Sequence, residues 1–296
     1  MSNDSRHPSP PHPNPLPEGE GAGAGEARAV VRVRDGRASH ETDHLALEEP
    51  LEIRVRGRAV SVTMRTPGHD DELAAGFLLS EGIIAGSADV IRVEPCDRTD
   101  AGNVVNVVLE PTVHVDFDRL TRHVFASSSC GLCGKASIEA VHNQFKPVDA
   151  ADVTVGASLL LQLPGHMYDV QSTFHRTGGL HAAALFDTEG KLIVLREDVG
   201  RHNAVDKVLG FALLSRLLPL ERHVLLVSGR ASFEIVQKAL AGRVPIIAAV
   251  SAPSSLAMEF AEASNQTLVG FLREGRMNVY AHPRRLRGLG QLDEQG

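Results

Sequence analysis

The chain has 296 residues, of which 43% are hydrophobic and 4% aromatic, with no tryptophan and a formal net charge of -7. This length suits one large domain or two small ones, and the core must be largely aliphatic. The negative charge and the lack of a basic stripe argue against nucleic acid as the main partner, and the lack of a long apolar run argues against a transmembrane helix.

Residues 1–27 are rich in proline, glycine and polar side chains and have no hydrophobic periodicity. Such a segment buries too little apolar surface to offset its conformational entropy, so we predict a disordered tail. A secretory signal is not expected, because no positive region is followed by an apolar one. The chain has three cysteines, an odd number that does not make a disulfide framework and that favours a reducing, cytoplasmic location.

Residues 28–121 predict a small α+β domain. Apolar residues alternate with charged ones at 51–55 and 60–64 around Gly57-Arg58, which predicts a hairpin with one solvated face. A helix is expected to follow at 71–79, capped by Asp70. Two further alternating runs, at 90–93 and 104–109, complete a mostly antiparallel unit.

Residues 122–296 predict an α/β layer sandwich with a partly parallel sheet, because strand and helix patterns alternate along them. The expected helices span 135–144, 157–163, 203–216, 232–240 and 254–263. The expected strands span 181–186, 191–195, 223–227, 245–250, 267–272 and 277–280. The domain boundary is placed near Thr121.

The stretch Ser127–Gly134 reads SSSCGLCG and contains Cys130 and Cys133. Glycines let the backbone turn sharply, and the positive N-terminus of the helix expected next would lower the pKa of a thiol and favour its reactive thiolate form. The alternative is two inert cysteines in a turn. A structural zinc site commonly needs a second pair of ligands, and neither a second CxxC nor the deaminase signature is present.

Several strand-to-helix turns carry polar and charged residues. One turn lies in REDVGRHNAVDK, where Asp198 or Asn203 can cap the helix, another is the SGR of residues 228–230, and a third follows Val250. Turns that follow neighbouring strands meet at one sheet edge, where helix N-termini and arginines bind phosphate groups. The sequence therefore predicts a pocket for an anionic, nucleotide-like ligand, formed by His181, Arg201, His202, Ser228, Gly229, Arg230, Arg273 and Arg276.

Each of these turns also has a purely structural explanation that involves no ligand. Serines before helices are ordinary caps, charged loops are often only solvated, His181 can be a satisfied core histidine, and arginines at a hairpin tip can simply face solvent.

Five segments together resemble the formate dehydrogenase accessory sulfurtransferase family, the FdhD/NarQ-type sulfur carriers. They are SSSCGLCG, RTGGLHAAAL, EDVGRHNAVDK, VSGRASFEIVQKA and VGFLREGRMNVY, and they lie between Ser127 and Tyr280. The resemblance covers most of the chain after about residue 28.

The resemblance implies a cytidine-deaminase-like fold with a small extra N-terminal domain, and a homodimer. It implies that a cysteine desulfurase supplies sulfur, held as a persulfide on Cys130. The acceptor would be the molybdenum cofactor, as bis(molybdopterin guanine dinucleotide), on its way to formate dehydrogenase. Cys133 matches the second cysteine of the family's pair. The segment implied to bind the cofactor comprises Val269, Gly270, Phe271, Leu272 and Arg273.

Three other functions fit parts of the sequence. A zinc-dependent deaminase-like hydrolase would use Cys130, Cys133 and a histidine such as His181 as ligands. A thiol–disulfide oxidoreductase would use the CxxC, although the thioredoxin-like context is missing. A nucleotide-binding chaperone would leave both cysteines without a role.

Overall fold

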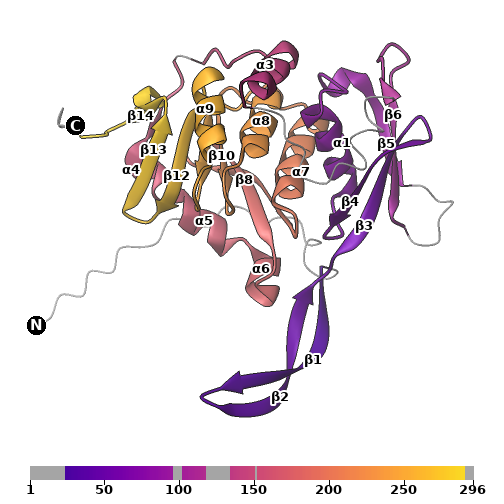
Figure 1. Cartoon of the computed structure of the whole chain (residues 1–296), viewed down its shortest axis with the longest axis vertical. Coiled ribbons are helices and arrows are strands. Elements are labelled where there is room, and N and C mark those ends of the chain that lie inside the picture. The colour runs from indigo at the N-terminus through magenta and orange to yellow at the C-terminus, as the bar shows by residue number, and fades with distance from the viewer. Residues whose placement is uncertain (1–23, 96–101, 118–133, 151, 291–296) are drawn as a thin grey trace, which may run out of the picture.

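The computed structural model describes residues 24–95, 102–117, 134–150 and 152–290, and their arrangement is shown in Figure 1. The described residues of the N-terminal part form the strands β1 (Gly25–Arg34), β2 (Arg37–Ala46), β3 (Glu49–Val55), β4 (Arg58–Arg65), β5 (Val90–Pro95) and β6 (Val104–Leu109) and the helix α1 (Asp70–Ser80). Strands β4-β3-β6-β5 form one sheet in that order, with β3 and β6 parallel and the outer pairs antiparallel. The predicted hairpin and the strands after it are therefore confirmed.

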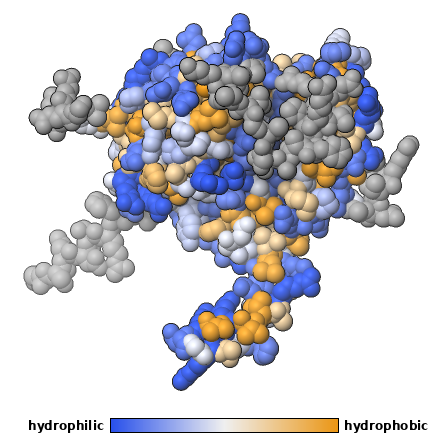
Figure 2. Space-filling view, in the orientation of Figure 1, coloured by the Kyte–Doolittle hydropathy of each residue, from blue (hydrophilic) through white to orange (hydrophobic). Residues whose placement is uncertain are grey.

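Strands β1 and β2 form a separate two-stranded ribbon that projects away from the body of the molecule (Figures 1 and 2). Val31 and Val33 on this ribbon are 58% and 66% exposed. Because β1 begins at Gly25, residues 25–27 form part of a strand, and the prediction that they belong to the disordered tail is wrong. β2 was not predicted, since its sequence RASHETDHLA has no apolar alternation.

The C-terminal part is built on a six-stranded sheet, called here the large sheet, with the strand order β13-β12-β11-β10-β8-β9. Its strands are β8 (His181–Asp187), β9 (Leu192–Asp198), β10 (His223–Val227), β11 (Ile246–Ala249), β12 (Thr267–Arg273) and β13 (Arg276–Ala281). β10, β11 and β12 are parallel to one another, whereas β8 and β13 run antiparallel to their neighbours. The expected partly parallel sheet is confirmed.

Helices α7 (Arg201–Leu214), α8 (Phe233–Ala241) and α9 (Ser255–Ala263) each connect two parallel strands of the large sheet. Successive right-handed crossovers that advance in one direction place such helices on one face of a sheet. In Figure 1 these three helices lie in front of the strands, while α4 (Ala157–Leu160) lies behind them. All four residues of β11 are buried, as expected for a strand with both faces covered.

The remaining elements are short, apart from α3 (Gly134–Gln144), and comprise α5 (Leu163–Asp169), α6 (Ser172–Thr177), a parallel pair formed by β7 (Val155–Gly156) and β14 (Leu286–Arg287), and the 3-10 turns Ser87–Asp89 and Pro283–Arg285. The single helix predicted at 157–163 is wrong, because the chain forms α4 and α5 there. α6 was not predicted. Within the described ranges, none of the helices has the length and apolar character needed to cross a membrane.

The two parts share one hydrophobic core. Buried apolar side chains form a single cluster that extends from Leu51 in β3 to Ala281 in β13. The predicted boundary at Thr121 lies outside the described residues, and so does most of the segment 1–27.

The two parts meet where α1 crosses α7. Gly76 and Gly210 lie at the crossing, and a Cβ on either would overlap backbone atoms of the opposite helix, at Asp206 and Glu72 respectively. Two glycines therefore let the helices approach until their backbones touch.

Two predicted helix caps are wrong. His69 occupies the N-cap of α1, while the carboxylate of Asp70 accepts two hydrogen bonds of 2.9 Å from the Arg65 guanidinium. Gly200 occupies the N-cap of α7, so neither Asp198 nor Asn203 is the cap residue. In both places the predicted cap residue uses its side chain for a tertiary contact instead. The local sequence does not record such a contact, so the cap prediction failed.

Candidate functional site

The predicted turns do gather at one edge of the large sheet. β9, β10, β11 and β12 run in the same direction, so their carboxyl ends meet there, and β8 begins at the same edge because it runs the opposite way. His181 is paired with Asp198, and Ala183 with Val227, which fixes the register of these ends. In Figure 1 this edge faces downward, toward α5 and α6.

The turn after β10 is held against the start of β8. The Ala182 amide donates a hydrogen bond of 2.8 Å to Ser228 Oγ, and the Ser228 amide donates one of 2.9 Å to the Ala182 carbonyl. A Cβ on Gly229 would lie 3.4 Å from His181 Nδ1 and 3.6 Å from the Arg201 side chain. His181, Ser228, Gly229 and Arg201 therefore form one compact group, as the sequence predicted.

Three basic side chains, Arg201, His202 and Arg230, surround His181, and we call them the cationic group. Burial, followed by the charges of these three neighbours, holds the pKa of His181 below its ordinary value, although the nearby Asp198 carboxylate acts in the opposite direction. Protonation would add a further charge beside existing ones, so His181 is neutral at pH 7.

The members of the cationic group differ in how they are paired. His202 Nε2 lies 2.9 Å from Glu234 Oε2, and this contact is the main reason that the pKa of Glu234 is lowered. Arg201 Nε, in contrast, is buried without a hydrogen-bond partner among the described residues. A buried donor without a partner is costly, which makes Arg201 suited to an anionic ligand.

The turn after β11 joins this group to β12. Ala231 and Pro253 form a β-bridge, and the Phe271 amide donates a hydrogen bond of 3.1 Å to the Ser251 carbonyl. A Cβ on Gly270 would lie only 2.7 Å from Pro253. Phe271 has a φ of 51° and is 40% exposed. The edge is thus continuous from His181 to Phe271.

The other predicted binding residues of β12 and β13 do not all lie at this edge. Val269 and Leu272 are fully buried in the core, so only their backbones are open to a role in binding. Arg273 and Arg276 are paired at the tip of the β12–β13 hairpin and are exposed.

A pocket of about 570 Å³ opens beside this edge, between α5, α6 and the start of β8. We call it the α5–α6 pocket. Its lining is mainly apolar and includes Met167, Tyr168, Phe174 and Leu180, with the site residues His181 and Ser228 on one side. Gln171 also lines the pocket and is only 4% exposed.

Sequence reasoning did not identify the residues of α5 and α6 that line this pocket. The available signal was the run of small residues around His181, the Gly178-Gly179 pair before it and the alanines after it, and this run named no aromatic side chains. The start of α6 is fixed from a distance, because the Glu197 carboxylate accepts hydrogen bonds of 3.0 and 2.8 Å from the amides of Thr173 and Phe174.

The charges of the REDVGRHNAVDK segment are divided between the interior of the protein and the sheet edge. Asp198, Asp206 and Lys207 are buried, and each pairs with a specific partner inside the protein. Lys207 Nζ lies 2.8 Å from Asp198 Oδ2 and also donates to the Thr66 carbonyl of the N-terminal part. Of the charged side chains in this segment, Arg201 and His202 are the ones in the cationic group.

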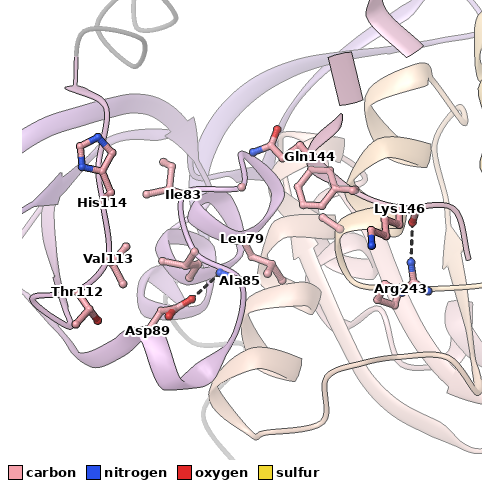
Figure 3. A pocket seen from close by; sticks show the side chains of 14 residues that line it. Leu79, Ile83, Ala85, Asp89, Thr112, Val113, His114, Gln144, Lys146 and Arg243 are labelled. Atoms are coloured by element: carbon pink, nitrogen blue, oxygen red, sulfur yellow. Dashed lines mark hydrogen bonds between the residues drawn. The ribbon is translucent and has the colours of Figure 1, made fainter. Parts of the chain in front are cut away.

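A second pocket, of about 440 Å³, lies where the N-terminal part meets the end of α3 (Figure 3). Its walls include Asp89 and His114 on one side and Gln144 and Arg243 on the other. Asp89 accepts a hydrogen bond of 2.6 Å from the Ala85 amide, and Arg243 donates one of 2.6 Å to the Lys146 carbonyl. These contacts brace local loops, and this pocket shares no lining residue with the α5–α6 pocket.

Cys130 and Cys133 lie outside the described residues. The helix expected after them is present as α3, which begins at Gly134. α3 packs on α9, where the His142 ring stacks on Phe260 with centroids 5.4 Å apart. Over the described ranges, no group of three or more His, Cys, Asp or Glu residues is placed to hold a metal ion. The zinc alternative depends on both cysteines and stays untested.

Comparison with known proteins gives a consistent picture. Residues 46–287 match the model of the FdhD/NarQ family. A protein of Streptomyces coelicolor named sulfur carrier protein FdhD is 53% identical over 261 residues, which cover 86% of this chain and 93% of that protein. The Mycobacterium tuberculosis protein of the same name is 52% identical over 251 residues, covering 82% of this chain and 91% of that one.

One solved structure is also similar. The crystal structure of a formate dehydrogenase accessory protein from Desulfotalea psychrophila superposes with a TM-score of 0.70 at 26% identity. The superposition covers 89% of this chain and 99% of that one.

Proposed function

Because this chain belongs to the FdhD/NarQ family, we propose that it is a sulfur carrier that serves the maturation of formate dehydrogenase. The printed names of its relatives support the carrier role, and the solved neighbour supports the link to formate dehydrogenase. The finer steps below are argued from the chemistry of the chain.

Cys130 receives the sulfur in this proposal. Its thiolate attacks the outer sulfur of a persulfide on a cysteine desulfurase, a new S–S bond forms, and the desulfurase cysteine leaves as a thiolate. The result is a Cys130 persulfide, and no external oxidant or reductant is consumed. The N-terminus of α3, which begins one residue after Cys133, favours thiolates in this segment.

Cys133 assists release of the sulfur. Its thiolate attacks Sγ of Cys130, the terminal sulfur departs as hydrosulfide, and a Cys130–Cys133 disulfide remains. The two electrons that reduce the sulfur come from the cysteine pair, and a cytoplasmic dithiol reductant restores both thiols.

The acceptor is the molybdenum cofactor in its bis(molybdopterin guanine dinucleotide) form, bound at the edge of the large sheet. One observation carries this half of the proposal: Arg201 has a buried, unpartnered Nε beside the N-terminus of the 14-residue helix α7. Pyrophosphate groups need such donors, and Arg230 and Gly229 lie at the same place. We further propose that the C-terminal part is a cytidine-deaminase-like three-layer sandwich, that the protein forms a homodimer and that it is cytoplasmic.

Mass spectrometry after incubation with a cysteine desulfurase and cysteine tests the carrier role. The wild-type protein is expected to gain about 32 Da per transferable sulfur, and Cys130→Ala is expected to gain none. Cys96→Ala is the matched control, because Cys96 lies outside the CxxC, and it is expected to load normally and to activate formate dehydrogenase.

A Cys130→Ala protein that still loads sulfur and still activates formate dehydrogenase would overturn the assignment. Loss of loading in Cys96→Ala, with Cys130→Ala unaffected, would move the carrier role to Cys96. Stoichiometric zinc in the purified protein, lost in Cys130→Ala, would favour the zinc hydrolase instead.

A further inference from the structure

A buried arginine near the end of the described chain carries a charge that its surroundings do not balance. Arg285 closes the 3-10 turn Pro283–Arg285 and is 0% exposed. Its Nε donates a hydrogen bond of 3.1 Å to the Ala150 carbonyl, while Nη1 and Nη2 are buried without a hydrogen-bond partner among the described residues. Most of the N–H donors of this guanidinium are therefore withdrawn from water and lack an acceptor in the described part of the chain.

The neighbouring charged side chains do not compensate Arg285. Asp149 is exposed, and Asp152 is also exposed and lies 3.7 Å from Arg222. Burial, followed by the positive charge of Arg284, lowers the pKa of Arg285. A guanidinium nevertheless stays protonated at neutral pH, because its ordinary pKa lies above 12. Arg285 is therefore a permanent cation in the protein interior, next to another cation.

Such a cation is costly to bury unless an anion accompanies it. An isolated charge loses its hydration in the interior, and each buried donor without an acceptor adds a further penalty. A water molecule would accept hydrogen bonds from the guanidinium but would leave its charge uncompensated. An anion removes both penalties at once, so a bound anion is the better physical explanation for an arginine at this position.

The packing around the site limits the size of that anion. Arg285 lines neither of the two pockets described above. The segment that contains its carbonyl acceptor is closely packed, since Val148, Val153 and Val155 are each at most 3% exposed. A phosphate ester or an organic carboxylate would need an opening to solvent, which a side chain without exposed surface does not offer. A single guanidinium inside a closed site is matched by a small ion with one negative charge.

The site lies where three segments of the chain meet. Arg285 reaches the loop before β7 through the Ala150 carbonyl, and β14, which begins at the next residue, pairs with β7. Arg284 Nη2 donates a hydrogen bond of 2.6 Å to Asn265 Oδ1 in the turn after α9. β12 begins and β13 ends beside these segments, so the site is at the opposite end of the large sheet from the cationic group.

From these observations we propose that Arg285 binds a small monovalent anion of the chloride type, and that this ion fastens the turn Pro283–Arg285 and β14 to the loop before β7. The ion accepts hydrogen bonds from Nη1 and Nη2, and its charge compensates that of the guanidinium. The site is structural, and it is independent of the proposed sulfur transfer.

Urea denaturation of the full-length protein at constant ionic strength tests the proposal. Potassium chloride is compared with potassium gluconate, whose anion is too large for a closed site. At a chloride concentration about nine times its dissociation constant, we expect the ratio of folded to unfolded protein to be about 10-fold higher than in gluconate, because the ion binds the folded state alone.

Two variants assign this effect to the buried guanidinium. Arg285→Met removes the charge and keeps a long unbranched side chain, and it is expected to be equally stable in the two salts. Arg287→Met is the matched control, because Arg287 is an exposed arginine of the same segment, and it is expected to keep the full response to chloride.

Two further measurements locate the ion without any variant. Hydrogen exchange at the amides of β7 and β14 is expected to be slower in chloride than in gluconate, while exchange in the β1–β2 ribbon is expected to be the same in both salts. Crystals of the wild type that contain bromide are expected to show an anomalous scattering peak within hydrogen-bonding distance of Arg285 Nη1 and Nη2.

Three results would each overturn the proposal. They are equal stability of the wild type in the two salts, a chloride effect of the same size in Arg285→Met, and a water molecule in place of bromide at the guanidinium. The bromide map and the wild-type comparison decide the question even where Arg285→Met does not fold.

Discussion

The α1–α7 interface and the edge of the large sheet both carry dense charge, and they differ in how that charge is paired. At the interface, Lys238 Nζ lies 2.8 Å from Asp206 Oδ2 and 2.9 Å from Ser80 Oγ, and the Arg196 guanidinium bonds the Glu72 carboxylate. At the edge, Arg201 Nε has no partner in the described part of the chain.

The comparison teaches that charge density does not distinguish a functional site from a structural one. The same twelve-residue segment, 196–207, supplies both regions, since Arg196 and Asp206 turn inward and Arg201 and His202 face the edge. Complete pairing in a buried setting is typical of a structural role, whereas an unpaired buried donor at the sheet edge is what the proposed anion site requires.

The largest expected effect comes from removing one of the paired charges at the α1–α7 interface. Asp206→Ala leaves Lys238 buried without its carboxylate, and we expect the free energy of unfolding to fall by about 3–5 kcal/mol. Urea denaturation followed by circular dichroism measures this. The double variant Asp206→Leu with Lys238→Met removes both charges and should recover much of the loss, and a single variant within 1 kcal/mol of wild type would contradict the structural role.

A second substitution tests the close approach on which the pairing depends. Gly76→Ala places a methyl group against the backbone of α7, and we expect a loss of about 1–3 kcal/mol in the free energy of unfolding. Gly165→Ala in α5 is the matched control, because no described atom lies within 4 Å of a Cβ there. If both variants had the same thermal midpoint, the helices would not be in backbone contact.

A third substitution tests the unpaired donor at the edge of the large sheet. Arg201→Ala is expected to weaken about 10-fold or more the binding of GDP, a probe that carries the guanine and diphosphate of the proposed acceptor, in line with loss of a charged hydrogen bond. It is expected to change the free energy of unfolding by less than about 0.5 kcal/mol. Titration calorimetry and urea denaturation give the two quantities. Arg222→Ala serves as control, because Arg222 lies at the opposite end of β10, and a large loss of stability in Arg201→Ala would place Arg201 with the structural charges.

The smallest effect is a pH dependence. Burial by itself would raise the pKa of Glu72, but hydrogen bonds from Arg196 and His69 outweigh it and lower the pKa below 4.5. Glu72 therefore stabilises the fold above its unfolded-state pKa, and this contribution disappears as the pH falls through the lower folded-state pKa. Between about pH 5 and pH 3, wild-type stability should fall more steeply than that of Glu72→Gln. Parallel curves would show that the pair does not shift the carboxyl group.

Much of the fold could be predicted from sequence because hydrophobic periodicity records it locally. β10 lies at His223–Val227 as expected, and Val90–Pro95 and Val104–Leu109 follow the alternating runs. β2 escaped prediction because its sequence has no apolar alternation, and its register is set by pairing with β1. α6 escaped because the Glu197 carboxylate, more than twenty residues further on, fixes its start.

The site was predictable to the extent that sheet topology brings turns together. Ser228, Gly229 and Arg201 meet because β9 and β10 are parallel, which their alternation with helices indicated. The roles of Asp198 and Asp206 could not be predicted, because their partners lie on other elements and depend on where α1 crosses α7.

The glycine crossing also decides which parts of the molecule can move. With the backbone of α1 against that of α7, neither helix can slide or roll past the other without collision. We therefore expect the two sheets to move together. Any change in the shape of the α5–α6 pocket is then expected to come from α5 and α6, the short helices that carry its aromatic walls.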